Sequence, residues 1–268
     1  MAKRIKVLIT VKTYPLPSKN YEELVCTAGI REDGTFIRLY PIDYRYRPYT
    51  QWYSKYQWIE ANVEKNTNDP RPESFRPLGD IKILGEPLGT AENWKERKKY
   101  ILANEIPTMC DLESCPQTEV SVGIIRPKEV TDFIIEETER EWKAQWIAQM
   151  RQLNLFGPEK KPLEKIPYKF SYKFICEHPK CKGHKKMIED WELGELYRRM
   201  RNKFQDEEIA CKKVKEKYYG DICDPKIDTH FFVGTVLQHG SWIILGTFWP
   251  KKEKPQAQQK SEQKSLFD

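Results

Sequence analysis

The sequence lacks any long apolar run. No stretch of about 18 or more apolar residues occurs, so a membrane-spanning helix is not expected. The chain also lacks, at its start, the residue pattern of a secretory signal. We therefore expect a protein of the cytoplasm that has no membrane partner.

Three motifs of phosphate and acyl chemistry are missing as well. The chain contains no glycine-rich phosphate loop, no nucleophile elbow and no dinucleotide fingerprint. Their absence gives no support to nucleotide-driven chemistry, and it leaves open whether the protein is an enzyme.

Cysteine is present, but in an odd number, seven. An odd number without a secretory signal does not suit a complete disulfide framework, so reduced thiols or metal ligation are the better interpretations. Hydrophobic residues make up 39% of the chain and aromatic residues 12%, which is enough for a sizeable core.

The hydrophobic pattern predicts an α+β fold, with a mixed sheet, helices and a C-terminal Cys/His insertion that resembles a zinc knuckle. Strands are expected at residues 5–11, 25–30, 35–40, 58–65, 81–84, 121–126, 131–136, 168–176, 229–237 and 242–249. Helices are expected at residues 90–104, 137–155, 187–203 and 206–219. The Asp33-Gly34 pair favours a hairpin between the second and third strands, because glycine readily adopts the positive φ of a tight turn.

Three regions are expected along the chain. Residues 1–156 form an N-terminal α+β region, and residues 157–249 form a basic Cys/His region. The boundary is a lysine- and proline-rich linker at residues 157–167. Two closing strands return to the N-terminal region, so both regions are expected to share one core. Residues 250–268 are too polar to bury and are expected to form a disordered tail.

An aromatic stretch at residues 40–58 mixes tyrosine and tryptophan with Arg45 and Arg47. Strand alternation places Arg38 just before it, on an aromatic face. Aromatic rings beside cations can stack on bases and hold phosphates, as in proteins that bind single strands. The alternative is a loop packed over a sheet, because aromatic side chains bury large areas wherever they lie.

Soft metal ligands gather in residues 170–191. Cys176 and Cys181 are followed by His184, and the intervening residues contain the proline and glycine that a tight turn needs. Thiolates and imidazole at this spacing predict a structural zinc site. The stretch supplies only three ligands, so the fold must bring in a fourth. Cys223 is our predicted fourth ligand, with His178, Cys211, His230 and His239 as alternatives.

Two further sets of residues could take part in catalysis or metal binding. Asp190 and Glu192 follow His184 and are weak candidates for acid–base catalysis if the metal keeps an open position, although acidic residues at a helix start usually complement its dipole. Cys110 and Cys115 repeat the spacing of the other pair, but no histidine lies nearby, so that pair is interpreted as incidental.

The net charge of +6 concentrates around the Cys/His stretch. Residues 157–217 hold 17 Lys and Arg against 11 Asp and Glu, so the rest of the chain is neutral on balance. A basic segment of this kind could attract a polyanion, although a solvated helical surface has the same composition. The candidate nucleic-acid contacts are Arg38, Arg45, Arg47, Lys180, Lys182, Lys185, Lys186, Arg198 and Arg199.

The last residues carry a short motif. Gln263, Ser265, Leu266 and Phe267 resemble the pentapeptide with which bacterial polymerases and repair proteins dock on the β sliding clamp. The resemblance implies that the glutamine fills a small pocket and that the Leu-Phe pair enters an apolar groove. Lys264 departs from the usual leucine. The resemblance covers these residues alone, and the body of the chain matches no family of known activity.

Together these features predict a DNA-associated protein that contains zinc and is recruited to the sliding clamp for DNA repair, replication or defence. One alternative is a metal-dependent nuclease or other hydrolase that acts on nucleic acid. Another is a protein-binding adaptor without affinity for nucleic acid.

Overall fold

The computed structural model describes residues 2–18, 22–153 and 163–253. The four residues of the clamp-like motif, Gln263, Ser265, Leu266 and Phe267, lie outside the described residues. Within the described part, no helix is long and apolar enough to cross a membrane.

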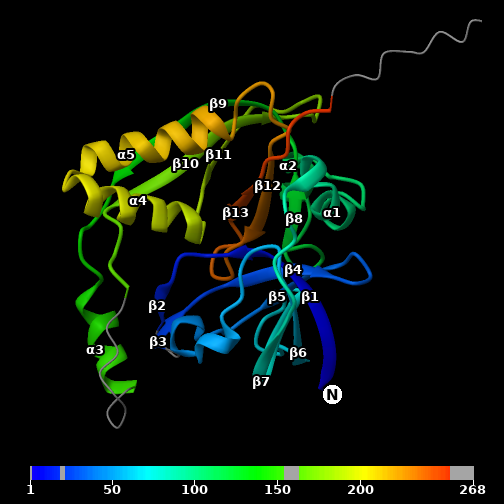
Figure 1. Cartoon of the computed structure of the whole chain (residues 1–268), viewed down its shortest axis with the longest axis vertical. Helices are drawn as coiled ribbons and strands as arrows, with labels where there is room; N and C mark the ends of the chain where they lie inside the picture. The colour runs from blue at the N-terminus through cyan, green and yellow to red at the C-terminus, as the bar shows by residue number, and fades with distance from the viewer. Residues whose placement is uncertain (1, 19–21, 154–162, 254–268) are drawn as a thin grey trace, which may run out of the picture.

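The N-terminal half is built around a closed barrel of five strands (Figure 1). These strands are β1 (Lys3–Lys12), β4 (Thr27–Arg31), β5 (Phe36–Leu39), β6 (Trp58–Lys65) and β7 (Ser74–Leu84). Their order around the barrel is β1-β4-β5-β7-β6, and only the β5–β7 pair is parallel. The first three strands therefore form a meander, β6 closes on β1, and β7 inserts between β6 and β5.

Alternation along the strands fills the barrel. The interior holds β-branched and aliphatic side chains, among them Val7, Ile9, Ile37, Leu39, Ile59, Ala61, Val63 and Ile81. The predicted hairpin between β4 and β5 is confirmed. Gly34 has a φ of 82° at its turn, and Asp33 accepts a hydrogen bond from the backbone N–H of Thr35.

Short elements connect the barrel strands. A hairpin of β2 (Leu16–Ser18) and β3 (Glu22–Leu24) follows β1. The aromatic stretch forms two single turns, η1 (Tyr44–Tyr46) and η2 (Tyr49–Gln51). Most of its rings pack onto the barrel, as with Tyr53, which is fully buried, but Tyr49 is 83% exposed. The packed-loop interpretation thus describes most of this stretch.

The C-terminal half contains two three-stranded sheets. One has the order β11-β10-β9, from β9 (Pro127–Glu137), β10 (Tyr168–Cys176) and β11 (His184–Met187). The other has the order β13-β12-β8, from β8 (Val122–Ile125), β12 (His230–Thr235) and β13 (Trp242–Phe248). Because β9 pairs with β10, the predicted boundary at residues 157–167 falls inside one sheet.

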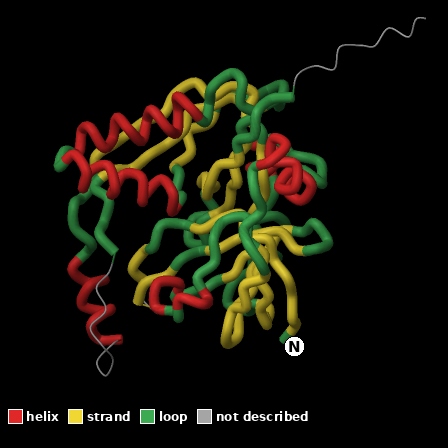
Figure 2. Tube along the Cα trace, viewed as in Figure 1, coloured by secondary structure: helices red, strands yellow, loops and turns green. Residues whose placement is uncertain are grey.

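Helices complete this half. They are α1 (Ala91–Ile101), α2 (Met109–Ser114), α3 (Ala144–Leu153), α4 (Trp191–Phe204) and α5 (Glu207–Lys215), and α5 runs into η3 (Glu216–Asp221). In Figure 2, α4 and α5 lie along one side of the long strands β9 and β10. Their apolar faces share a core with these strands that includes Phe133, Tyr172 and Tyr197.

A second core joins the two halves. Ala28 and Ile30 on the outer face of the barrel pack with Ile124, Phe232 and Ile243 of the β13-β12-β8 sheet. Residues of the other face of this sheet, such as Phe231 and Val233, belong to the core around Phe133 and Tyr172, so all of β8, β12 and β13 is buried.

The same contact corrects the expectation for Arg38. This side chain is only 2% exposed, because the β13-β12-β8 sheet covers the face of β5 from which it projects. Its guanidinium donates hydrogen bonds to the carbonyl and the hydroxyl of Ser121. Arg38 is thus a buried contact between the halves and is not available to nucleic acid.

The predicted boundaries differ from the structure in several places, and α2 was not predicted. The helix expected from residue 137 begins at Ala144, because β9 continues to Glu137. The helix expected from residue 187 begins at Trp191, because residues 184–187 form β11 against β10. Residues 74–79, expected as loop, are the start of β7.

Candidate metal centre

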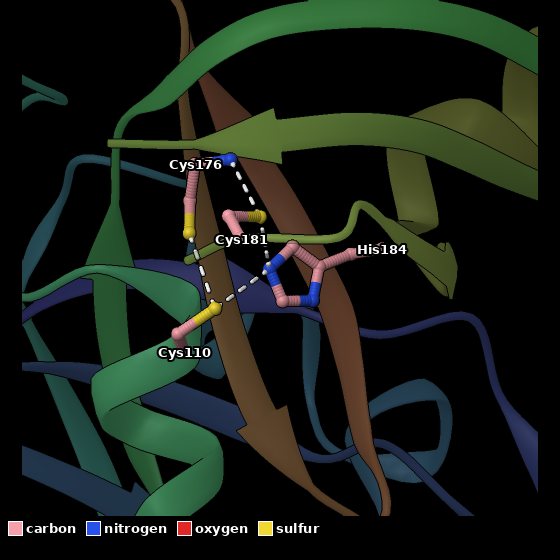
Figure 3. Close-up of side chains that lie close together, drawn as sticks. All are labelled: Cys110, Cys176, Cys181 and His184. Atoms are coloured by element: carbon pink, nitrogen blue, oxygen red, sulfur yellow. Dashed lines mark hydrogen bonds between the residues drawn. The ribbon is translucent and has the colours of Figure 1, made fainter. Parts of the chain in front are cut away.

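Three cysteines and one histidine meet in the C-terminal half (Figure 3). Cys110 lies on α2, Cys176 ends β10, Cys181 lies in the turn that follows, and His184 begins β11. Figure 3 shows their side chains pointing toward a common centre. One ligand atom from each residue lies within 4.8 Å of the others.

The spacing of these atoms fits a tetrahedral metal ion. Zinc, with bonds of about 2.3 Å to sulfur and about 2.0 Å to nitrogen, places two sulfurs about 3.8 Å apart and sulfur and nitrogen about 3.5 Å apart. Cys110 Sγ lies 3.6 Å from Cys176 Sγ and 3.5 Å from His184 Nε2. Cys181 Sγ lies 3.3 Å from the same nitrogen. The cluster could therefore hold a metal ion with little rearrangement.

The histidine is oriented by a residue from α2. His184 Nδ1 lies 3.1 Å from a carboxylate oxygen of Glu113, which leaves Nε2 to face the thiols. Glu113 also forms an ion pair with Lys186. A carboxylate behind a ligating imidazole fixes its tautomer and raises its basicity. The short helix α2 thus supplies both a ligand, Cys110, and the group that orients another ligand.

The thiols of the cluster differ in acidity. Burial raises the pKa of Cys110 to about 12, and the neighbouring thiols add to the increase. Burial opposes ionisation of Cys176 too, but hydrogen bonds from Cys110, His178 and the other two ligands outweigh it and lower its pKa to about 6. A divalent cation would stabilise all three thiolates together.

The turn between β10 and β11 is shaped around one sulfur. The backbone N–H groups of Cys176 and Gly183 each donate to Cys181 Sγ over 3.4 Å. Gly183 has a φ of 93°, which a residue with a side chain rarely adopts. Four protein ligands leave no open position for water, so the cluster suits a structural ion and not a catalytic one.

The structure brings together Cys176, Cys181 and His184, as their spacing predicted. It corrects the fourth ligand from Cys223 to Cys110. Cys223 Sγ donates to the backbone carbonyl of Tyr218, over 3.4 Å, and is not part of the cluster. The sequence did not predict Cys110 as a ligand, because no histidine is near it in the chain. The only available signal was the spacing that it shares with Cys115, and Cys115 is not in the cluster.

The two weak catalytic candidates lie elsewhere. Asp190 caps the N-terminus of α4 by accepting a hydrogen bond from the backbone N–H of Glu192. Its carboxylate lies 3.2 Å from the ammonium of Lys55, in the barrel half, and Glu192 lies 3.0 Å from the same ammonium. Neither carboxylate belongs to the metal cluster, so the geometry does not place them around a metal with His184.

This ion pair connects the two halves. The side chain of Lys55 is 3% exposed and that of Asp190 is 0% exposed, whereas that of Glu192 is 58% exposed. Burial alone would lower the pKa of Lys55, but Asp190 and Glu192 more than offset it, so the pKa is raised and the ammonium stays charged. Asp190 and Glu192 thus act as partners of a buried lysine.

The candidate nucleic-acid contacts divide into paired and open groups. Apart from the buried Arg38, five of them touch groups of the protein itself: Arg45 lies over the ring of Tyr46, Arg47 and Lys185 pair with Asp43 and Glu136, Lys186 pairs with Glu113, and Arg198 pairs with Glu195. Lys180, Lys182 and Arg199 are exposed, and among the described residues no ion pair involves them.

Two family models match the chain. Residues 104–268 match the model described as a domain of unknown function, DUF8757, and residues 3–103 match a second domain of unknown function, DUF8758. The two matches meet between α1 and α2, so the DUF8758 match covers the barrel and the DUF8757 match covers the metal centre and both three-stranded sheets. A search of curated proteins finds no match.

Proposed function

The chain belongs to the family of the domain of unknown function DUF8757, and we propose that this member is a DNA-associated protein that holds a structural zinc ion. We further propose that its C-terminal tail recruits it to the replication sliding clamp. The zinc assignment rests on the ligand set, because three thiolates and one imidazole in a tetrahedral arrangement suit zinc better than harder cations.

The observation that carries the DNA proposal is the turn built around Cys181. Lys180 and Lys182 flank this ligand, and both side chains are exposed. The metal centre fixes the backbone of the turn on both sides, so the two ammonium groups are presented by a rigid support. Unpaired lysines on a rigid turn are suited to phosphate contacts, because the backbone that carries them does not have to become ordered on binding.

The barrel gives a second, weaker support. A five-stranded Greek-key barrel resembles the oligonucleotide- and oligosaccharide-binding architecture. In such barrels the second and third strands form the binding face, but here the corresponding strands, β4 and β5, are covered by the β13-β12-β8 sheet. A fold alone does not imply a function, so the barrel supports the proposal only through its open loops, where Tyr49 and Trp52 are exposed.

Removing the two turn lysines should weaken DNA binding. We expect Lys180→Ala/Lys182→Ala to lower affinity for both single-stranded and duplex DNA, because two phosphate contacts are lost. The slope of log affinity against log salt should fall in magnitude by about 1.4 to 1.8. Fluorescence anisotropy at several salt concentrations measures both quantities.

A matched control is Lys3→Ala/Lys82→Ala, which removes two exposed lysines from the barrel strands β1 and β7. It should bind like the unchanged chain. Equal loss in both double variants would remove the turn from the proposal. Absence of any salt-dependent DNA affinity would favour the protein-binding adaptor.

The clamp proposal is tested separately. A variant with Leu266→Ala/Phe267→Ala should lose recovery in a pull-down with purified sliding clamp, because the apolar pair would enter the groove of the clamp. Lys260→Ala, in the same tail, should be recovered like the unchanged chain. Equal recovery of all three proteins would contradict recruitment through this motif.

A further inference from the structure

A cavity of about 360 Å³ is lined by residues that follow β1, begin β10 and begin α4. Its volume falls within the range of small-molecule sites, which is roughly 300–1,000 Å³. The metal centre and the turn lysines lie outside it. The wall is mainly apolar and includes the aromatic rings of Tyr14, Trp142 and Phe170.

The two outer rings are held in place. Tyr14 donates its hydroxyl to the carbonyl of Glu164, over 2.8 Å, and Trp142 donates its indole N–H to the carbonyl of Leu163, over 2.9 Å. Gly194 on α4 makes room for Tyr14, because a Cβ atom there would lie 2.2 Å from the tyrosine ring. The cavity is therefore preformed, with flat apolar surfaces.

Two acidic side chains in this wall, Glu139 and Glu189, form no hydrogen bond or ion pair among the described residues, and Glu189 is the less exposed of the two. The backbone N–H of Glu189 is bonded to the carbonyl of Ile244, which fixes its position after β11. Burial raises the pKa of this carboxyl group, with no neighbouring charge to compensate. A carboxylate in an apolar wall is stabilised by a ligand that donates a hydrogen bond to it.

Two lysines also line this cavity. Lys169 is exposed, and no ion pair among the described residues involves it. Lys165 donates to the carbonyl of Glu141 and also lines the cavity. The exposed carboxylate of Glu139 lies in the same wall, so the cavity carries both signs of charge, and Lys169 is the group that would contact an anionic end of a ligand.

The aromatic wall, the carboxylate of Glu189 and the ammonium of Lys169 together favour one class of ligand. We propose that the cavity binds a nucleotide whose base carries an exocyclic amino group. The ring lies against the aromatic wall, the amino group donates to Glu189, and the phosphate contacts Lys169. A free nucleotide and a base extruded from DNA share this chemistry. The DNA source rests on the proposed function, whereas the ligand chemistry does not.

Calorimetric titration of the whole chain tests the proposal with dCMP, deoxycytidine and dTMP. We expect dCMP to bind at least about tenfold more tightly than dTMP, because thymine lacks the amino group and a hydrogen bond to a charged acceptor contributes about 1.5–3 kcal/mol. Deoxycytidine should bind more weakly than dCMP. No heat with dCMP at millimolar concentration, or tighter binding of benzylammonium than of dCMP, would overturn the proposal.

Two variants assign the contacts. Glu189→Gln should reduce the preference for dCMP over dTMP severalfold, and Lys169→Ala should abolish the preference for dCMP over deoxycytidine. Glu137→Gln and Lys173→Ala make the same changes at exposed positions of β9 and β10 outside the cavity, and they should bind like the unchanged chain. Thermal melting verifies folding of each variant. Unchanged preferences in well-folded Glu189→Gln and Lys169→Ala would refute the assignment.

A competition experiment distinguishes a free nucleotide from a base extruded from DNA. If a cytosine opposite an abasic site in duplex DNA competes with dCMP, and Glu189→Gln weakens that competition, the cavity accepts an extruded base. If dCMP binds but this DNA does not compete, the cavity takes free nucleotides. The inference then stands without the proposed DNA function, so the two can fail separately.

Discussion

Replacing Cys110 with serine should prevent binding of the proposed zinc ion and remove much of the stability of the C-terminal half. Structural zinc contributes apparent free energies of about 10–16 kcal/mol in peptides that fold around it. A half with its own core depends on the ion less completely, but α2 is held to the β10–β11 turn through this cluster. Because each kcal/mol moves the thermal midpoint of a domain of this size by about 2–4 °C, we expect a fall of roughly 10 °C or more.

The control for this change is Cys115, five positions further along the chain. Cys115→Ser removes a partly buried thiol outside the cluster, so zinc content and midpoint should stay close to those of the unchanged chain. Metal content by mass spectrometry and melting with and without chelator measure both effects. A Cys110→Ser protein that kept one tightly bound zinc per chain would refute the four-ligand site.

Asp190→Asn should destabilise the folded chain by about 3 kcal/mol, because removing one partner of a buried ion pair leaves a buried charge. Asparagine caps a helix as well as aspartate does, so the start of α4 is retained and the loss reports the charge. Glu192 remains near the ammonium of Lys55, which keeps the effect at the lower end of the usual range. Urea unfolding measures the free energy.

Two companions separate the ion pair from other causes. Glu192→Gln should cost less than about 1 kcal/mol, because exposed ion pairs contribute little. Lys55→Met combined with Asp190→Asn should be more stable than Asp190→Asn alone, because no uncompensated charge is then buried. If the losses in unfolding free energy from Lys55→Met alone and Asp190→Asn alone simply added up in the double variant, Lys55 and Asp190 would not act as a pair.

Sequence reasoning found the part of the metal centre that is local. Cys176, Cys181 and His184 are close in the chain, and the turn between them is defined by proline and glycine. Cys110 lies 66 residues before Cys176, and its approach depends on how α2 packs against β10. Neither hydrophobic periodicity nor motif spacing predicts how α2 packs against β10. The sequence therefore could not identify which distant cysteine or histidine is the fourth ligand.

Arg38 shows a second limit. Strand alternation correctly separates the two faces of β5, but it cannot say what covers the outer face. The covering sheet comes from β8, β12 and β13, which are distant in sequence. The predicted start of α4 was wrong for a related reason. The segment before it, His184–Met187, is rich in lysine and has no strand pattern, yet it pairs with β10 through backbone hydrogen bonds and begins at a metal ligand.

The covering of the barrel also sets an order of events during synthesis. The last barrel strand, β7, ends at Leu84. Of the sheet that buries Ala28 and Ile30, β8 is made next, but its partners β12 and β13 begin only at His230 and Trp242. At a ribosomal rate of about 5–20 residues per second, this apolar face waits on the order of 10 s for its cover. The nascent barrel therefore exposes an apolar surface until the rest of the sheet that covers it has been synthesised.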